Sequence, residues 1–336
     1  MIREAITKLV EKNDLSESEA EAVMHQIMHA EATPSQIGAF ITALRMKGET
    51  VAEITGCARA MRANATRVNT KQKFLIDTCG TGGDGTGTFN ISTVVSIVVA
   101  GAGIAVAKHG NRSVSSRCGS ADLFEALGVK IDLGPEEVAR CIDEVGIGFL
   151  FAPHFHPAMK YAAAPRREIG IRTVFNILGP LANPASASTQ LMGVYSPDLT
   201  ETLAQVLDSL GTNQAMVVHG GGLDELSTIA TNKISQLLNG QITTYNLDSS
   251  ELGLAPACLA ELEGGTPQEN AEITYKLLHG ETGAKRNTVL LNAAAAFVAI
   301  EKAVDFETGI TLAVESIDSG QALNKLEHLI QLSNTI

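Results

Sequence analysis

Residues 77–92 read DTCGTGGDGTGTFNIS, and five of the eight residues from Gly80 to Gly87 are glycine. The apolar run 74–76 precedes this stretch and a largely apolar run follows Ser92, so the pattern predicts a strand, a glycine loop and a helix. Such a loop turns backbone N–H groups and a helix N-terminus toward an anion, and glycine has no Cβ to hold a phosphate away. The alternative is a tight turn that binds nothing.

A second polar loop strengthens the anion-binding interpretation. Residues 108–120 read KHGNRSVSSRCGS; they follow the apolar run 104–107 and precede a helical pattern at 121–127. In an open α/β sheet, ligands bind at the carboxyl ends of the strands. Lys108, Arg112 and several hydroxyls give this loop many donors for one multiply charged anion. A solvated surface loop is the alternative, and two such loops after consecutive strands argue against it.

The fold class predicted from the pattern is α/β, with a small all-helical part and a large α/β part around a mostly parallel sheet. The first sixty residues carry three helix-start signatures, which are the pairs Ser16 and Glu19, Thr33 and Gln36, and Thr50 and Glu53. From residue 74, short apolar runs alternate with helical patterns, which is typical of a sheet covered on both faces. The predicted strands are 74–77, 104–107, 147–151, 190–194, 215–219, 225–230 and 242–245.

Composition excludes several classes of protein. The 336 residues carry a formal net charge of −12, which opposes general nucleic-acid binding. The five cysteines form no CxxC pair, so a disulfide framework or zinc site is not expected and a reducing cytoplasm fits best. No apolar run is long enough to span a membrane, and the N-terminus has no signal-peptide pattern. The sequence therefore predicts a cytoplasmic protein that binds a small anion.

Taken in order, the motifs resemble those of anthranilate phosphoribosyltransferase, the tryptophan-pathway enzyme. They are GTGGD at 80–84, NIST at 90–93, KHGNR at 108–112, FAP at 151–153, HPAM at 156–159, RTVFNILGPLANP at 172–184, GVYSP at 193–197, GLDE at 222–225 and GGTPQEN at 264–270. The resemblance covers essentially the whole chain. It implies transfer of the 5-phosphoribosyl group from phosphoribosyl diphosphate to the amine of anthranilate, giving N-(5-phosphoribosyl)anthranilate and diphosphate, with Mg²⁺. This is the second step of tryptophan biosynthesis from chorismate.

The resemblance also implies an organisation of the chain. The chain is expected to have the fold that these transferases share with pyrimidine nucleoside phosphorylases. Residues 1–70 are expected to form the helical domain, completed by about 158–185, while 71–157 and 186–336 form the α/β domain that binds phosphoribosyl diphosphate. The N-terminal helices have more apolar face than they can bury among themselves, so a homodimer is expected there. Association with anthranilate synthase is left open.

Site residues follow from the matched motifs. Phosphoribosyl diphosphate is expected at Gly80, Gly83, Asp84, Thr88, Asn90, Ile91, Ser92, Thr93, Lys108, His109, Gly110, Asn111, Arg112, Ser113, Val114, Ser115, Ser116 and Ser120. Anthranilate is expected at Gly80, Asn111 and Arg166, since a guanidinium pairs bidentately with a carboxylate. The metal is expected at Ser92, Asp224 and Glu225, because Mg²⁺ prefers oxygen ligands. Taken alone, Asp224 and Glu225 would be a solvated pair, and Ser92 a helix N-cap.

No residue is predicted to act as a certain acid or base. Loss of diphosphate places positive charge on the ribose and negative charge on the leaving group, so electrostatic and positioning roles are expected for Lys108, Asp84 and His109. The neutral amine is already nucleophilic, which makes His109 and His156 more plausible as structural or positioning residues than as bases. Arg172 is expected to support Asn176 and the loop after it.

The sequence opposes two rival functions. A pyrimidine nucleoside phosphorylase typically has a lysine after the Gly-Asp of its glycine loop, whereas Gly85 follows Asp84 here. A non-catalytic nucleotide- or nucleic-acid-binding relative is opposed by the net charge and by the retention of a complete set of charged site residues, which are Asp84, Lys108, Arg166, Asp224 and Glu225.

Overall fold

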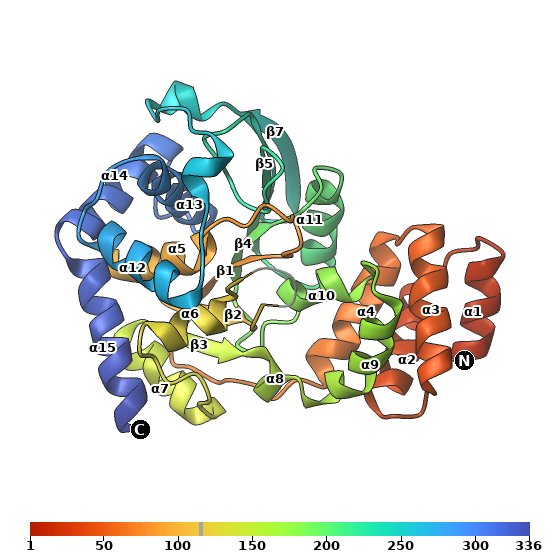
Figure 1. Ribbon diagram of the computed structural model, residues 1–336. Helices are drawn as coiled ribbons and strands as arrows, with labels where there is room; N and C mark the ends of the chain where they lie inside the picture. The colour runs from red at the N-terminus through yellow and green to blue at the C-terminus, as the bar shows by residue number, and fades with distance from the viewer. Residues whose placement is uncertain (114–116) are drawn as a thin grey trace.

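A computed structural model describes residues 1–113 and 117–336. Two lobes are visible, a larger α/β body around one sheet and a smaller lobe of helices that begins at the N-terminus (Figure 1). The predicted fold class is confirmed, since a helical N-terminal part is joined to an α/β part whose sheet is mostly parallel.

The sheet has seven strands in the order β3-β2-β1-β4-β5-β6-β7. They are β1 Ile76–Gly80, β2 Val106–Gly110, β3 Ile147–Phe151, β4 Thr189–Gly193, β5 Gln214–Gly220, β6 Asn232–Leu238 and β7 Gln241–Leu247. The first five run parallel, whereas β6 and β7 pair antiparallel. The carboxyl ends of β1, β2, β4 and β5 therefore lie along one edge, which is where the polar loops are expected to meet.

One predicted strand is wrong. Residues 225–230 form a loop, and the strand that follows is β6 instead. The Asn232 side chain explains the difference: its Oδ1 accepts the Ser227 N–H at 2.7 Å and its Nδ2 donates to the Ser227 carbonyl at 3.0 Å. These bonds satisfy the backbone of the loop locally, so it does not join the sheet. Strand β1 also begins two residues later than predicted.

The N-terminal lobe starts with four helices, α1 Ile2–Val10, α2 Glu17–Met28, α3 Pro34–Lys47 and α4 Val51–Ala63. The three predicted capping boxes are present: Ser16, Thr33 and Thr50 each accept a backbone N–H three residues on, and the side chain at that third position reaches back. Glu53 does more than cap, because it is fully buried and its carboxylate also accepts the Leu15 N–H and the Lys47 ammonium.

The remaining helices complete both lobes. They are α5 Ile91–Gly101, α6 Ser120–Ala126, α7 Pro135–Val145, α8 Ala152–Phe155, α9 Lys160–Ile169, α10 Phe175–Leu181, α11 Leu199–Ser209, α12 Pro267–Leu278, α13 Ala284–Ala299, α14 Phe306–Asp318 and α15 Gln321–Thr335, with short 3₁₀ turns at Pro157–Met159, Ser249–Leu252 and Leu259–Leu262. None of the helices in the described part of the chain is long and apolar enough to cross a membrane.

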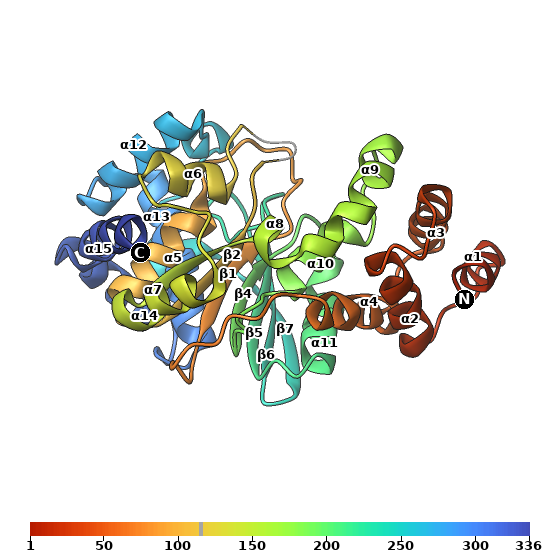
Figure 2. The same cartoon turned by 90° about the horizontal axis from the view of Figure 1, so that it is seen from below.

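The sheet separates two hydrophobic cores. Neighbouring residues of β4 face opposite ways, with Leu191 packed into the core under α5 and α13 and Met192 packed toward α11 and the N-terminal helices. Helices α5 and α13–α15 cover one face of the sheet, and α4, α10 and α11 lie toward the other (Figure 2). Helix α9, which lies within residues 158–185, packs against α2 and α3. The domain boundaries themselves remain a prediction.

Two arginines of α4 join the lobes. Arg62 donates to the Leu181 carbonyl at 2.6 Å and to the Leu210 carbonyl at 3.2 Å, and Arg59 donates to the Ser209 carbonyl at 2.6 Å. These acceptors lie at the C-terminal ends of α10 and α11, where helix carbonyls have no partner within the helix. Cationic donors there also complement the helix dipole. The bonds to Ser209 and Leu210 hold α4 to the α/β body, while the bond to Leu181 holds it to α10.

Candidate active site

The glycine loop leaves the carboxyl end of β1 and enters α5 at Ile91. Its first residue is fixed to β4, because the Thr81 N–H donates to the Gly193 carbonyl at 2.9 Å. Its far end pairs with another segment: the Phe89 N–H donates to Leu262 at 3.0 Å and the Gly264 N–H donates to Gly87 at 3.0 Å. The middle of the loop is therefore held at both ends, with its φ angles positive at four glycines, Gly82, Gly83, Gly85 and Gly87.

The acidic pair after β5 meets this loop and the start of α5. The Gly82 N–H donates to Asp224 Oδ2 at 2.6 Å, and the Ser92 N–H donates to Glu225 Oε1 at 3.1 Å. The three predicted metal residues Ser92, Asp224 and Glu225 are thus brought together. The fit is close: a Cβ on Gly80 would lie 2.3 Å from Asp224 Oδ2, so a larger residue here would displace the Asp224 carboxylate.

The site has an excess of negative charge. Burial, followed by the nearby charge of Asp84, raises the pKa of Asp224 to about 7. Burial and then the Asp224 charge raise the pKa of Glu225 well above its usual range. Carboxylates that are costly to ionise together are stabilised by a bound cation, and their hard oxygen atoms suit Mg²⁺.

The donor set fits a cation that keeps part of its water shell. Across residues 1–113 and 117–336, no three His, Cys, Asp or Glu side chains converge tightly enough to enclose an ion unaided. Magnesium is usually held in this partial way, by one or two carboxylates with waters and substrate phosphates completing the octahedron. A hydroxyl such as that of Ser92 is a further suitable ligand.

Lys108 lies beneath the site and does not project from its loop. Its side chain is only 2% exposed, and Nζ donates to the Thr78 carbonyl and lies 3.4 Å from Ser92 Oγ. Its positive charge lowers the pKa of the neighbouring carboxyls Asp77 and Glu225, although burial outweighs it and raises the pKa of Asp77 to about 6. The structure therefore places Lys108 as an internal counter-ion between β1 and the start of α5.

The Lys-His-Gly-Asn-Arg loop is anchored to α6. The Ser113 N–H donates to Asp122 Oδ2 at 3.0 Å, and the Ser120 hydroxyl donates to the Asn111 carbonyl at 3.3 Å. Arg112, predicted to bind phosphoribosyl diphosphate, forms ion pairs with Asp122 at 2.9 Å and Glu125 at 2.8 Å. In this conformation its guanidinium is directed to α6. The predicted residues Val114, Ser115 and Ser116 lie outside the described part of the chain.

Arg166 is half-buried on α9, with its guanidinium 5.1 Å from the centre of the Phe175 ring. Burial lowers the pKa of this guanidinium, and it forms no ion pair with any described residue. Hydrogen bonds do not join it to the other predicted anthranilate residues, Gly80 and Asn111, within the described chain. A half-buried cation without a counter-ion is suited to an anionic ligand group.

Two histidines form a buried pair at the junction of the lobes. The rings of His109 and His156 lie 5.1 Å apart between centroids, and neither Nε2 has a hydrogen-bond partner among the described residues. Burial lowers the pKa of His156 to about 4 and that of His109 well below its usual range. Both rings are therefore neutral at pH 7, and that neither acts as a general base remains a prediction.

Sequence reasoning missed the position of Arg172. It was expected to support Asn176, but the Asn176 side chain instead accepts the Thr173 N–H at 3.0 Å. The Arg172 guanidinium donates to the Gly83 carbonyl and lies 4.5 Å from the centre of the Tyr195 ring. Asn270, inside a matched motif but given no role, was also missed: its Nδ2 donates to Asn90 Oδ1 at 2.8 Å, next to the start of α5.

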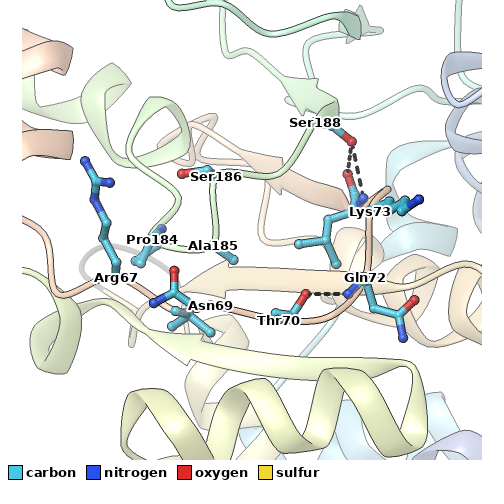
Figure 3. A pocket seen from close by; sticks show the side chains of 11 residues that line it. Arg67, Asn69, Thr70, Gln72, Lys73, Pro184, Ala185, Ser186 and Ser188 are labelled. Carbon is cyan, nitrogen blue, oxygen red and sulfur yellow. Dashed lines mark hydrogen bonds between the residues drawn. The ribbon is translucent and has the colours of Figure 1, made fainter.

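A cavity of about 230 Å³ lies at the opposite end of the sheet. It is lined by residues that precede β1 and β4, including Lys73 and Ser188 (Figure 3). Figure 3 shows the charged side chains of Arg67 and Lys73 pointing away from one another. Because they do not converge on one point, this cavity lacks the arrangement of an anion site, and the glycine-loop edge is the better candidate.

Comparison with known proteins gives the class. Residues 72–323 match the family model described as glycosyl transferase family, a/b domain, and residues 3–65 match the one described as glycosyl transferase family, helical bundle domain. The fold and site thus define a two-domain glycosyl transferase.

The particular family follows from full-length relatives named anthranilate phosphoribosyltransferase. One from Moorella thermoacetica is 58% identical over 331 residues, covering 98% of each chain, and one from Pelotomaculum thermopropionicum is 56% identical over 337 residues, covering 100% of this chain and 98% of the relative. The chain belongs to the anthranilate phosphoribosyltransferase family, which confirms the resemblance drawn from its motifs.

Solved structures of two anthranilate phosphoribosyltransferases are similar to this chain over nearly its whole length. The Thermus thermophilus enzyme is 44% identical with a TM-score of 0.94, covering 98% of this chain and 99% of its own. The enzyme from Saccharomyces cerevisiae, solved in complex with PRPP and Mg, is 29% identical with a TM-score of 0.91, covering 100% of this chain and 98% of its own.

Proposed function

We propose that this chain transfers the 5-phosphoribosyl group of phosphoribosyl diphosphate to the amine of anthranilate with Mg²⁺, in the second step of tryptophan biosynthesis from chorismate. The observation that carries the proposal is the meeting of the Asp224–Glu225 pair with the glycine loop and the first turn of α5. Family membership and the yeast complex with PRPP and Mg support it.

The chemistry requires charge stabilisation at the leaving group. As the bond from C1 to the diphosphate breaks, negative charge grows on the diphosphate, facing the backbone N–H groups of the glycine loop and the N-terminus of α5. Asp224, Glu225 and Ser92 would hold Mg²⁺, which would supply positive charge to stabilise the leaving diphosphate. The remaining predicted loop residues are proposed to orient the phosphates.

The anthranilate is proposed to lie between α9 and the glycine loop. Arg166 takes its carboxylate, while Gly80 and Asn111 border the ring, and the neutral amine then attacks C1 without a general base. Phosphoribosyl diphosphate is proposed to bind on the α/β loops alone and anthranilate between these loops and the helical segment, so closure of the lobes brings the two substrates together and excludes water from a reactive ribosyl cation.

Arg166→Ala is expected to raise the KM for anthranilate far more than the KM for phosphoribosyl diphosphate. Loss of a charge-assisted contact of about 1.5–3 kcal/mol corresponds to roughly 10–150-fold. Steady-state kinetics with each substrate varied in turn would measure both constants. An unchanged anthranilate KM beside a large rise for phosphoribosyl diphosphate would reverse the assignment of the two substrates.

The reaction itself is tested by the loss of anthranilate fluorescence, with and without phosphoribosyl diphosphate and Mg²⁺. Consumption that requires both supports the transferase. The phosphorylase alternative predicts no consumption of anthranilate, together with phosphate-dependent cleavage of a pyrimidine nucleoside, which can be assayed in parallel with the same preparation.

A homodimer through the N-terminal helices is also proposed. Val10 is 69% exposed and Met46 is 82% exposed, so the first and third helices present large apolar side chains to solvent. Sedimentation at micromolar concentration is expected to give the mass of two chains, and Val10→Asp with Met46→Asp to give one. A wild-type monomer would contradict the proposal. Cytoplasmic location and an association with anthranilate synthase remain predictions.

A further inference from the structure

Arg172 occupies the short segment between α9 and α10, in a position that the proposed chemistry has not used. Helix α9 ends at Ile169 and is followed by Gly170, whose φ is +67°, and α10 begins at Phe175. The Arg172 side chain is exposed and forms no ion pair with any of residues 1–113 or 117–336. Its guanidinium donates to the Gly83 carbonyl instead.

Tyr195 provides a platform for this guanidinium. The Arg172 Cζ lies 4.5 Å from the centre of the ring, a distance at which cation–π attraction is favourable. Tyr195 is itself fixed to the base of the glycine loop, because its N–H donates to Thr81 Oγ1 at 3.2 Å. The ring and the Gly83 carbonyl therefore belong to one local unit of the α/β lobe, and Arg172 reaches this unit from the helical segment.

The contact fixes the direction of one peptide group. The Gly83 carbonyl and the Asp84 N–H belong to the same planar peptide unit, and in the trans form they point in opposite directions. A carbonyl held by Arg172 therefore turns the Asp84 N–H away from Arg172. The Asp84 N–H has no hydrogen-bond partner within the described chain. By contrast, the Gly82 N–H donates to the Asp224 carboxylate and the Thr86 N–H donates to the Asp84 carboxylate.

We propose that Arg172 is a positioning residue for the diphosphate. Through the Gly83 carbonyl it orients the Asp84 N–H as a free donor for a phosphate oxygen, with Tyr195 holding the guanidinium in place. The assignment of the ligand as a diphosphate rests on the proposed function. The contact between Arg172 and the Gly83 carbonyl does not depend on that function, and it can be measured on the protein without ligands.

The experiment compares Arg172→Ala with Arg167→Ala. Arg167 is an exposed arginine on α9 with no hydrogen bond or ion pair to any described residue, so it controls for loss of a nearby positive charge. Hydrogen exchange is measured on the amides of residues 81–86 without ligands, and KM is measured separately for each substrate. Circular dichroism checks that each variant is folded.

Arg172→Ala is expected to speed exchange in residues 81–86 and to raise the KM for phosphoribosyl diphosphate, each by roughly tenfold, the effect of losing one hydrogen bond to a charged group. The KM for anthranilate and all constants of Arg167→Ala are expected to stay within about twofold. Arg172→Lys keeps a donor but stacks less well, and is expected to lie between wild type and Arg172→Ala.

Tyr195 supplies a second, independent test. Tyr195→Phe keeps the aromatic ring and is expected to resemble the wild type, while Tyr195→Ala is expected to resemble Arg172→Ala. The double variant Arg172→Ala with Tyr195→Ala is expected to be no worse than either single variant, since both remove one interaction. Additive losses would overturn the role of the ring.

Two other outcomes overturn the proposal. A raised KM for phosphoribosyl diphosphate with unchanged exchange would mean that Arg172 touches the phosphates directly. Faster exchange with an unchanged KM would mean that the contact has no part in binding. Absence of any transferase activity in the wild type would defeat the proposed function instead, and the exchange arm would still decide whether Arg172 holds the loop.

Discussion

Asp224→Asn combined with Glu225→Gln is expected to lower kcat/KM by roughly 100-fold or more, with loss of the Mg²⁺ dependence. The two carboxylates are the acidic groups that meet both the glycine loop and the first turn of α5. Amide side chains keep the shape and the hydrogen-bonding oxygen of each residue but remove its charge, so a divalent cation loses most of its attraction.

Measurement of Tm distinguishes this loss of activity from unfolding of the protein. Because burial raises the pKa of both carboxyls, their ionised forms are disfavoured in the folded protein, and replacing them with neutral amides at pH 8 is not expected to lower Tm. Asp198→Asn with Glu201→Gln is a matched control, since both side chains are exposed on the solvent side of the start of α11. Magnesium titrations of both double variants decide the question. Normal activity and magnesium dependence in the first would place the metal elsewhere.

Gly193→Ala is expected to lower activity nearly as much as the double substitution at Asp224 and Glu225, although Gly193 has no side-chain functional group. A Cβ at this position would lie 1.5 Å from the Asp224 carbonyl oxygen and 2.3 Å from its carbonyl carbon. Backbone atoms cannot rotate aside as a side chain can, so the Asp224–Glu225 turn must move away from β4. We expect destabilisation of about 3 kcal/mol and a loss of activity that extra Mg²⁺ only partly restores.

Gly38→Ala is the control for this substitution. Gly38 lies inside α3, where the added methyl meets Ile169 Cδ1 at 3.5 Å, an ordinary contact distance. Alanine is also the better helix former, so stability is expected to be unchanged or higher by up to about 1 kcal/mol. Urea denaturation and a Mg²⁺ titration on both variants test the comparison, and a wild-type profile for Gly193→Ala would show that the turn can move without cost.

Local chemistry made much of the fold predictable. The helix starts at Ser16, Thr33 and Thr50 each depend on residues three positions apart, so their signal is complete within a few residues of sequence. The strand predicted at 225–230 failed because residues with high strand propensity, such as Thr228 and Ile229, were overruled by side-chain bonds from Asn232. Propensity carries no information about such a competitor.

The candidate site was predictable only in part, for a related reason. Asp224 and Ser92 were assigned to one metal site through the resemblance to the transferase family, and in the structure both follow strands whose carboxyl ends share one edge. Nothing local distinguishes Arg172 from Arg167, since the difference is a contact with Gly83, 89 residues away in sequence. Likewise, the ion pairs that direct Arg112 to α6 depend on the spacing of Asp122 and Glu125 in three dimensions.

The two arginines of α4 also have a consequence for how the chain folds as it is synthesised. The carbonyls that Arg62 binds are 119 and 148 residues further along the chain, and that of Arg59 is 150 residues further. At a synthesis rate of about 5–20 residues per second, α4 waits roughly 7–30 s before its last partner leaves the ribosome. Over that interval the N-terminal helices can form but cannot dock, so the lobe made first is completed only after most of the sheet has been synthesised.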